Sequence, residues 1–202
     1  KTVNSLHVTK GKNRVAHMEI HAIWPIPEES RHWLLQPITF DHQDYSRGIR
    51  NAGWTALVLD PIIDGLHFTQ VLMDSGSDLN LLYQDTIRKM GINPAIIRHG
   101  NTSFQGVVPG PDTHCMGSLL LEVMFGSPDN FRSEKLTFHI APFISSYQAL
   151  LGREAFARFN AIPHYASLTL KMPGPRGIIS LKGNIERSSS ADDGAAALIA
   201  AH

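Results

Sequence analysis

Short apolar runs separated by turn residues are the feature that most constrains the fold of this chain. The runs at 55–59 and 67–73 flank Asp64-Gly65, a dipeptide typical of a two-residue hairpin turn. Two short stretches, 83–90 and 153–159, have the patterns and stop signals of helices. Further strand-like runs lie at 115–125, 131–140, 149–152, 168–170 and 178–181. The sequence therefore predicts a mostly β fold with one or two short helices.

The composition is that of an ordinary globular protein. In 202 residues, 18 Lys and Arg balance 18 Asp and Glu, which argues against general electrostatic binding to nucleic acid or to an anionic membrane. No apolar run reaches the roughly 18 residues of a membrane span, and the basic N-terminal stretch lacks the apolar region of a signal peptide. The single cysteine, Cys115, excludes an internal disulfide. These features predict a cytoplasmic, non-secreted protein without a membrane partner.

Changes in composition divide the chain into three regions. Residues 1–37 begin with basic residues and continue into a proline-broken stretch, which predicts a lead-in or linker. Residues 38–183 contain the strand and helix patterns and are expected to form the domain. Residues 184–202 contain serine and alanine runs typical of a C-terminal linker.

The strongest candidate for chemistry is the segment 71–77, with the sequence Val-Leu-Met-Asp-Ser-Gly-Ser. An apolar strand delivers Asp74 into a tight turn, Ser75 offers a hydroxyl, and Gly76 lets the backbone bend and leaves room beside the carboxylate. The same residue types also form ordinary surface turns. The apolar run before Asp74 favours a partly buried, functional carboxylate.

A second segment makes this pattern more specific. Leu150-Leu151-Gly152-Arg153 follows downstream, and an apolar-apolar-Gly segment after Asp-Ser-Gly is the paired signature of aspartic proteases. The chain resembles the protease region of gypsy-type LTR retrotransposon gag-pol polyproteins, in particular those of plants. The residues that carry this resemblance lie at 38–41, 71–82, 90–92, 125–126, 130–132, 150–153, 163–165 and 170–174.

The resemblance implies a retropepsin-like acid protease barrel for residues 38–183 and an aspartic endopeptidase that processes a polyprotein. Such a domain contributes one aspartate, so the active enzyme is expected to be a homodimer. Asp74, Ser75 and Gly76 would be the catalytic residues. The residues that support them would be Ser77, Asp78, Leu151, Gly152 and Arg153. No metal or organic cofactor is expected, because water is the nucleophile, and 184–202 would lead toward a reverse transcriptase.

Two details of the resemblance concern particular contacts. The segment 104–110 has glycines flanking an apolar tip, and the resemblance implies a flap that closes over the substrate. The flap residues would be Phe104, Gln105, Gly106, Val107 and Val108, with a plain surface hairpin as the alternative. Asp78 and Arg153 are expected to form a guanidinium–carboxylate pair that ties the second helix to the active-site loop, and two independent surface charges are the alternative.

Other functions remain open at this point. The same barrel could be a catalytically inactive dimerisation or binding module from a decayed or co-opted element, although the intact Asp74-Ser75-Gly76 argues against decay. The argument for nucleic-acid binding through the basic N-terminal stretch is weak, because the net charge is zero and no RNA-binding motif is present in the sequence. His17 and His21 have a spacing that suits one helix face, but they lack the further ligands that a metal site needs.

Overall fold

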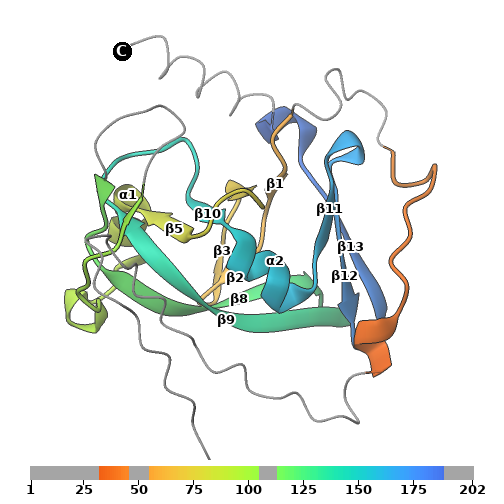
Figure 1. Cartoon of the computed structure of the whole chain (residues 1–202), viewed down its shortest axis with the longest axis horizontal. Coiled ribbons are helices and arrows are strands. Elements are labelled where there is room, and N and C mark those ends of the chain that lie inside the picture. Colours follow the sequence, from red (N-terminus) through yellow and green to blue (C-terminus); the bar gives the residue numbers. More distant parts are fainter. Residues whose placement is uncertain (1–31, 46–54, 105–112, 189–202) are drawn as a thin grey trace, which may run out of the picture.

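The computed structural model describes residues 32–45, 55–104 and 113–188 (Figure 1). These residues are mostly β, with the short α-helices α1 (Gln84–Met90) and α2 (Arg153–Phe159), so the predicted fold class is confirmed. The strands are β1 (Val58–Leu59), β2 (Ile62–Ile63), β3 (Leu66–His67), β4 (Val71–Met73), β5 (Asn80–Tyr83), β6 (Ser103–Phe104), β7 (Thr113–His114), β8 (Ser118–Ser127), β9 (Asn130–Ala141), β10 (Ala149–Leu151), β11 (Ile162–His164), β12 (Thr169–Gly174) and β13 (Gly177–Lys182). Short 3-10 turns are η2 (His32–Leu35), η3 (Pro94–Ile96) and η4 (Tyr165–Ser167).

The larger sheet places distant segments of the chain side by side. Its strand order is β1-β4-β10-β5-β9-β8-β2-β3, and the long strands β8 and β9 curve beneath the rest of the domain (Figure 1). β10 lies parallel to β4, with Leu150 opposite Leu72 and Leu151 opposite Met73. The ends of β4 and β10 therefore meet at the same edge, so that the Asp74 turn lies beside Gly152.

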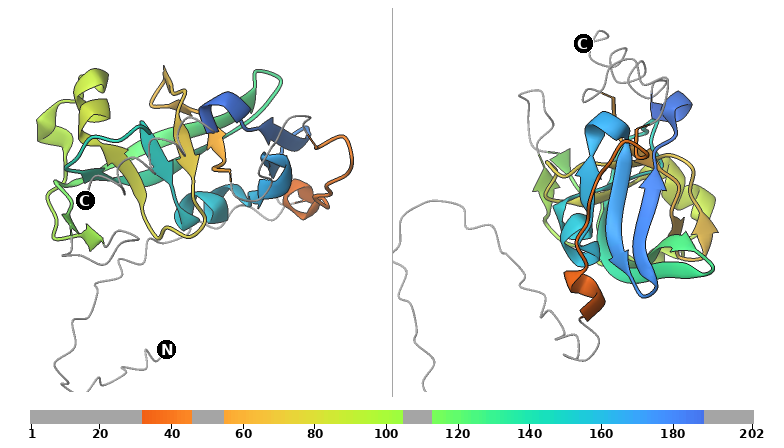
Figure 2. Two further views of the ribbon diagram at one scale, coloured as in Figure 1. Left: turned by 90° about the horizontal axis from the view of Figure 1, so that it is seen from above. Right: turned by 90° about the vertical axis from the view of Figure 1, so that its right-hand side faces the viewer.

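A smaller sheet of order β11-β12-β13 follows α2 (Figure 2). Its strands β12 and β13 contact β8 and β9 of the larger sheet. β12 and β13 form a hairpin in which Gly174 lies opposite Gly177, so the turn is Pro175-Arg176 alone. The sequence predicts a longer turn, over 173–177. The strands extend further because Pro173 is a residue of β12 and pairs with Ile178.

The Asp64-Gly65 turn joins different strands from those that the sequence predicts. It connects β2 and β3, in which Ile63 lies opposite Leu66, and both turn residues have positive φ. This backbone matches the twist of a hairpin. The flanking runs do pair with each other, because β1 lies antiparallel to β4 with Val58 opposite Leu72. The predicted strand over 67–73 is wrong at 68–70, which lie between β3 and β4.

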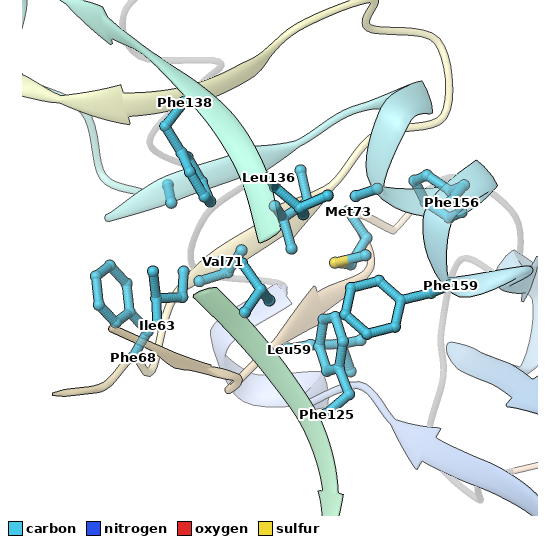
Figure 3. Close-up of a cluster of buried hydrophobic side chains, with 14 of the residues drawn as sticks. Leu59, Ile63, Phe68, Val71, Met73, Phe125, Leu136, Phe138, Phe156 and Phe159 are labelled. Carbon is cyan, nitrogen blue, oxygen red and sulfur yellow. The ribbon is translucent and has the colours of Figure 1, made fainter. Parts of the chain in front are cut away.

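The core forms between the curved sheet and α2. Along β8 the buried and exposed positions alternate, as expected for a strand with one face toward a core. Figure 3 shows Met73 of β4 beside Phe159 of α2, and Phe125 of β8 contacts Phe159 edge-on at 5.1 Å between ring centroids. Because Met73 is only 2 % exposed, the residue before Asp74 is anchored by packing.

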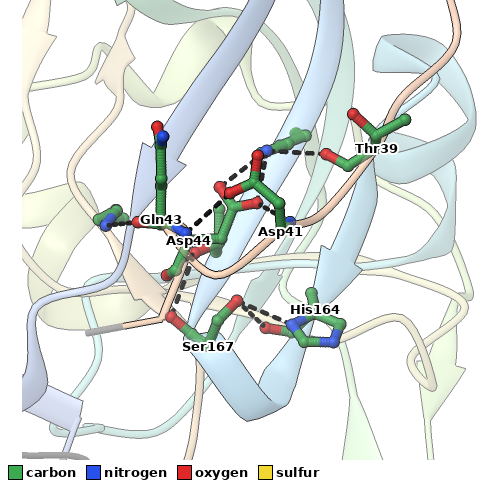
Figure 4. A network of polar contacts seen from close by, with 9 residues as sticks. Thr39, Asp41, Gln43, Asp44, His164 and Ser167 are labelled. Atoms are coloured by element: carbon green, nitrogen blue, oxygen red, sulfur yellow. Dashed lines mark hydrogen bonds and ion pairs between the residues drawn. The ribbon is translucent and has the colours of Figure 1, made fainter. Parts of the chain in front are cut away.

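Residues 33–45 lie against the smaller sheet and α2. The Arg132 guanidinium lies over the Trp33 ring at 4.9 Å, and Lys171 of β12 forms a 2.7 Å ion pair with Asp44. Lys171 also donates to the Thr39 carbonyl at 2.8 Å (Figure 4). The Phe40 ring stacks on His164. The end of the predicted lead-in is therefore packed on the domain, while residues 1–31 lie outside the described residues.

Candidate active site

The carboxylate of Asp74 is held at the end of β4 by its own loop. Its backbone N–H donates to the Leu151 carbonyl of β10 at 3.0 Å. Its Oδ1 accepts the Gly76 N–H at 2.9 Å, and its carbonyl accepts the Ser77 N–H at 3.2 Å. The Asp74 side chain is half-buried. The turn therefore presents a carboxylate with a fixed orientation and one oxygen already hydrogen-bonded to the backbone.

Gly152 lets β10 and α2 approach this loop closely. The Arg153 N–H donates to the Ser77 carbonyl at 2.7 Å, which joins the start of α2 to the Asp74 turn. A Cβ atom at position 152 would lie 2.7 Å from the Ser77 carbonyl oxygen and still closer to that of Leu79. Both are backbone atoms, so a side chain at 152 would push the two segments apart. This contact explains why glycine stands at this position.

The predicted supporting residues lie in the same place. Asp78 and Arg153 form an ion pair at 2.9 Å, as expected, although both side chains are largely exposed. Leu151 is fully buried beneath the loop. The Ser77 hydroxyl donates to the Leu79 carbonyl at 2.9 Å, so it stabilises its own turn rather than contacting Asp74. The candidate catalytic and supporting residues are thus brought together by β4, β10 and α2.

Asn80 is an essential part of this arrangement that the sequence analysis missed. It is 1 % exposed, and its Oδ1 accepts the Gly152 N–H at 2.9 Å. Its Nδ2 donates to Glu154 Oε2 at 2.9 Å and to the Thr137 carbonyl at 3.0 Å. One amide therefore joins β5 to β9 and to the start of α2 at Gly152 and Glu154. The available signal was an asparagine within the apolar strand Asn-Leu-Leu-Tyr, because a buried polar side chain needs partners.

Two tyrosines lie close to the Asp74 loop. The Tyr165 hydroxyl lies 3.2 Å from the Ser75 hydroxyl, within hydrogen-bonding distance. Burial raises the pKa of Tyr83, and the negative charge of Asp74 adds to this rise, while a hydrogen bond with Ser145 opposes it. Burial is the largest of these causes of the shift in the pKa of Tyr83, and the charge of Asp74 is the smallest of the three.

Aromatic side chains extend from Tyr83 toward the predicted flap. The Tyr83 ring lies 5.6 Å from that of Phe143, which lies 6.0 Å from that of Phe104. Phe104 belongs to β6, which pairs antiparallel with β7. The predicted flap residues Gln105, Gly106, Val107 and Val108 lie outside the described residues.

Three further observations concern the described part of the chain. There, no three His, Cys, Asp or Glu side chains gather where they could hold a metal ion. Burial raises the pKa of the Cys115 thiol, which disfavours the reactive thiolate. Among the same residues, no helix is long and apolar enough to cross a membrane.

Comparisons with known proteins give matches among solved structures only. No family model and no curated protein matches the chain. The retroviral protease-like domain of Ddi1 from Leishmania major matches at 12% identity and a TM-score of 0.45, over 64% of this chain and 94% of that chain. A retropepsin-like aspartic protease from Rickettsia conorii matches at 15% identity and a TM-score of 0.44, over 62% of this chain and 86% of that one.

A third match is the EIAV protease in complex with the inhibitor HBY-793. Its identity is 15% and its TM-score is 0.35, over 55% of this chain and 91% of that chain. Because all three identities are low, the geometry around Asp74 is what bears on function.

Proposed function

We propose that this chain is a retropepsin-like aspartic endopeptidase that acts as a homodimer. The observation that carries the proposal is the Asp74 turn, which places a half-buried carboxylate at the end of a buried strand, bonds it to the Gly76 N–H, and is approached closely by Gly152 at Ser77 and Leu79. A surface turn would need neither the hydrogen bond to Leu151 nor the close approach of α2. The Asp-Ser-Gly and Leu-Gly-Arg segments of the sequence support the same function.

The chemistry follows from bringing two such carboxylates together. Each chain contributes one Asp74, so the dimer would hold two of them beside its two-fold axis. Two close carboxylates cannot both carry full charge, and they share a proton, as in aspartic proteases generally. The charged member takes a proton from a bound water molecule while the other donates to the peptide carbonyl. Water attacks directly, so no acyl-enzyme forms.

The finer function is the processing of a polyprotein from a retrotransposon of the plant gypsy type. This part of the proposal is supported by the sequence resemblance over residues 38–183. The substrate would then be an extended peptide at a polyprotein boundary, including the boundaries of the protease itself. The alternative that the experiment must distinguish from this function is an inactive dimerisation module with the same fold.

The test is cleavage of a mixed peptide library between about pH 4 and 6, a range suited to a carboxylate pair that shares one proton. The full chain is compared with Asp74→Asn, and the dimer fraction is measured by sedimentation. Asp64→Asn is the matched control, because Asp64 is an exposed carboxylate in a turn away from the site. We expect cleavage by the wild type and by Asp64→Asn but not by Asp74→Asn. A folded dimer without Asp74-dependent cleavage would identify a binding module instead.

A further inference from the structure

We propose that Tyr165 is a positioning residue for the catalytic loop, which it holds through the hydroxyl of Ser75. This inference rests on the proposed protease function and adds a residue to its machinery. The two residues are 90 positions apart, and their hydroxyl oxygens lie 3.2 Å from each other. Ser75 directly follows Asp74, so whatever fixes its side chain also restrains the loop that carries the carboxylate.

The distance is longer than the usual O–H···O hydrogen bond. Contacts of this kind are often long in unliganded enzymes and shorten when substrate binds. Both side chains are partly buried, which reduces competition from water for the two hydroxyls. The pair is therefore a contact that substrate binding would shorten.

Tyr165 is itself held by a rigid part of the fold. Its ring packs against the hydrophobic core, and its carbonyl accepts the Leu168 N–H at 3.2 Å, which closes the η4 turn. The Leu168 carbonyl in turn accepts the Gly183 N–H at 2.6 Å, next to the end of β13. A side chain fixed in this way presents its hydroxyl at a constant position. The smaller sheet thus provides a support for the active-site loop.

His164, the residue before Tyr165, is held by contacts with Phe40 and Ser167. The His164 ring stacks on Phe40 at 4.9 Å between centroids, and its Nδ1 lies 2.8 Å from the Ser167 hydroxyl. Ser167 is fully buried. The segment 33–45 therefore helps to fix the η4 turn, and through it the position of the Tyr165 hydroxyl.

The chemistry of the pair defines what Tyr165 contributes. A serine hydroxyl has one proton to donate and two lone pairs that accept. When Tyr165 donates to Ser75 Oγ, the Ser75 proton stays available for an acceptor near the two-fold axis, and the side chain is held in one rotamer. Without this hydroxyl, Ser75 samples other rotamers and the two Asp74 carboxylates meet in the reactive geometry less often. The step affected is the chemical one rather than substrate binding.

The experiment compares the full-length wild type, Tyr165→Phe, Ser75→Ala and the double variant. Tyr45→Phe is the matched control, because Tyr45 contacts the same His164 ring but its side chain is 55% exposed. Activity is measured at protein concentrations at which sedimentation shows every protein to be dimeric.

For Tyr165→Phe we expect a loss in kcat of about tenfold, with KM changed less than about twofold. The double variant should match Ser75→Ala, because both substitutions remove the same contact. Ser75→Thr, which keeps a hydroxyl, should retain kcat.

Three results would overturn the inference. The first is an active wild type in which Tyr165→Phe leaves kcat as high as Tyr45→Phe does. The second is an active wild type in which the losses in kcat of Tyr165→Phe and Ser75→Ala multiply independently. The third is measured without any activity: the free energies of unfolding of the same four proteins would show no coupling between positions 75 and 165. An inactive wild type whose unfolding free energies do show coupling would instead overturn the proposed protease function and leave the contact in place.

Discussion

At the scale of single residues, Asn80 joins the parts of the site through one buried amide group. It accepts the Gly152 N–H and donates to Glu154 and to the Thr137 carbonyl. Asp78, two residues earlier, also links the loop to α2, through its ion pair with Arg153. The Asp78–Arg153 pair is exposed and Asn80 is buried. The two links should therefore contribute very differently to the free energy of unfolding.

We predict that Asn80→Ala lowers the free energy of unfolding by roughly 2–4 kcal/mol, because it leaves the Gly152 N–H and the Thr137 carbonyl without their partner. Asp78→Asn, the matched control, should cost about 0–1 kcal/mol, as exposed ion pairs usually do. Urea unfolding of the two variants measures both values. Equal losses would show that the buried amide does not carry the link between β5 and α2.

The residues around Asp74 show how much of the site could be predicted from the sequence. Asp74, Ser75, Gly76 and the Asp78–Arg153 pair follow from short motifs, because their residue types and spacing are specific together. Asn80 and Tyr165 act through partners that only the topology places beside them, such as Ser75, 90 residues from Tyr165. Both residues lie within ranges that carry the resemblance, 71–82 and 163–165, but their partners are distant in the sequence, so the sequence analysis assigned neither of them a role.

At the scale of elements, the longer strands and the two helices were predicted better than the pairing of the strands. Apolar runs predicted strands at 115–125 and 131–140, which correspond to β8 and β9, and the spacing of apolar residues before Gly91 predicted a helix that corresponds to α1. Gly91 ends that helix in the left-handed conformation, as expected for a glycine C-cap. The parallel pairing of β4 with β10 depends on residues almost 80 positions apart, and neither short strand alone specifies its partner.

The attachment of segment 33–45 to the smaller sheet gives a prediction for pH. The hydrogen bond from Lys171, followed by that from the Asp41 N–H, lowers the pKa of Asp44 below its ordinary value of 3.8. A carboxyl whose pKa is lowered by folding stabilises the folded state above its ordinary pKa and loses this effect as the pH falls through the lowered value. Wild type should therefore be more stable than Asp44→Asn near pH 7, and the difference should narrow below pH 3.8.

Denaturant midpoints of the two proteins between about pH 2.5 and 7 measure this difference. Lys171→Met is the companion variant, because it removes the other half of the contact; it should also lose the acid-sensitive part of the stability. Lys182, which donates to the Gln43 carbonyl, lies beside the pair and stays unchanged in both variants. A difference between wild type and Asp44→Asn that is constant with pH would show that the Asp44 charge does not hold the segment.

At the scale of the whole molecule, the number of catalytic carboxylates decides how the chain can act. The sequence has one Asp-Ser-Gly segment after an apolar strand, and the similar run Asp192-Asp193-Gly194 is not preceded by an apolar strand pattern in the sequence. The proposed mechanism needs two carboxylates that share a proton. A single chain supplies only one of them, so activity should belong to the pair of chains.

Mixing subunits tests this dependence directly. If each active site needs Asp74 from both chains, a dimer of one wild-type and one Asp74→Asn subunit is inactive. Adding an equal amount of Asp74→Asn to a saturated wild-type dimer, with time for exchange, should then reduce activity to about half, and a larger excess should reduce it further. The same amounts of Asp64→Asn, which keeps Asp74, should not reduce it. If Asp74→Asn subunits exchange into the dimer, as labelled subunits would report, and activity stays constant, then each chain cleaves with its own single carboxylate and the shared-proton mechanism is wrong for this protein.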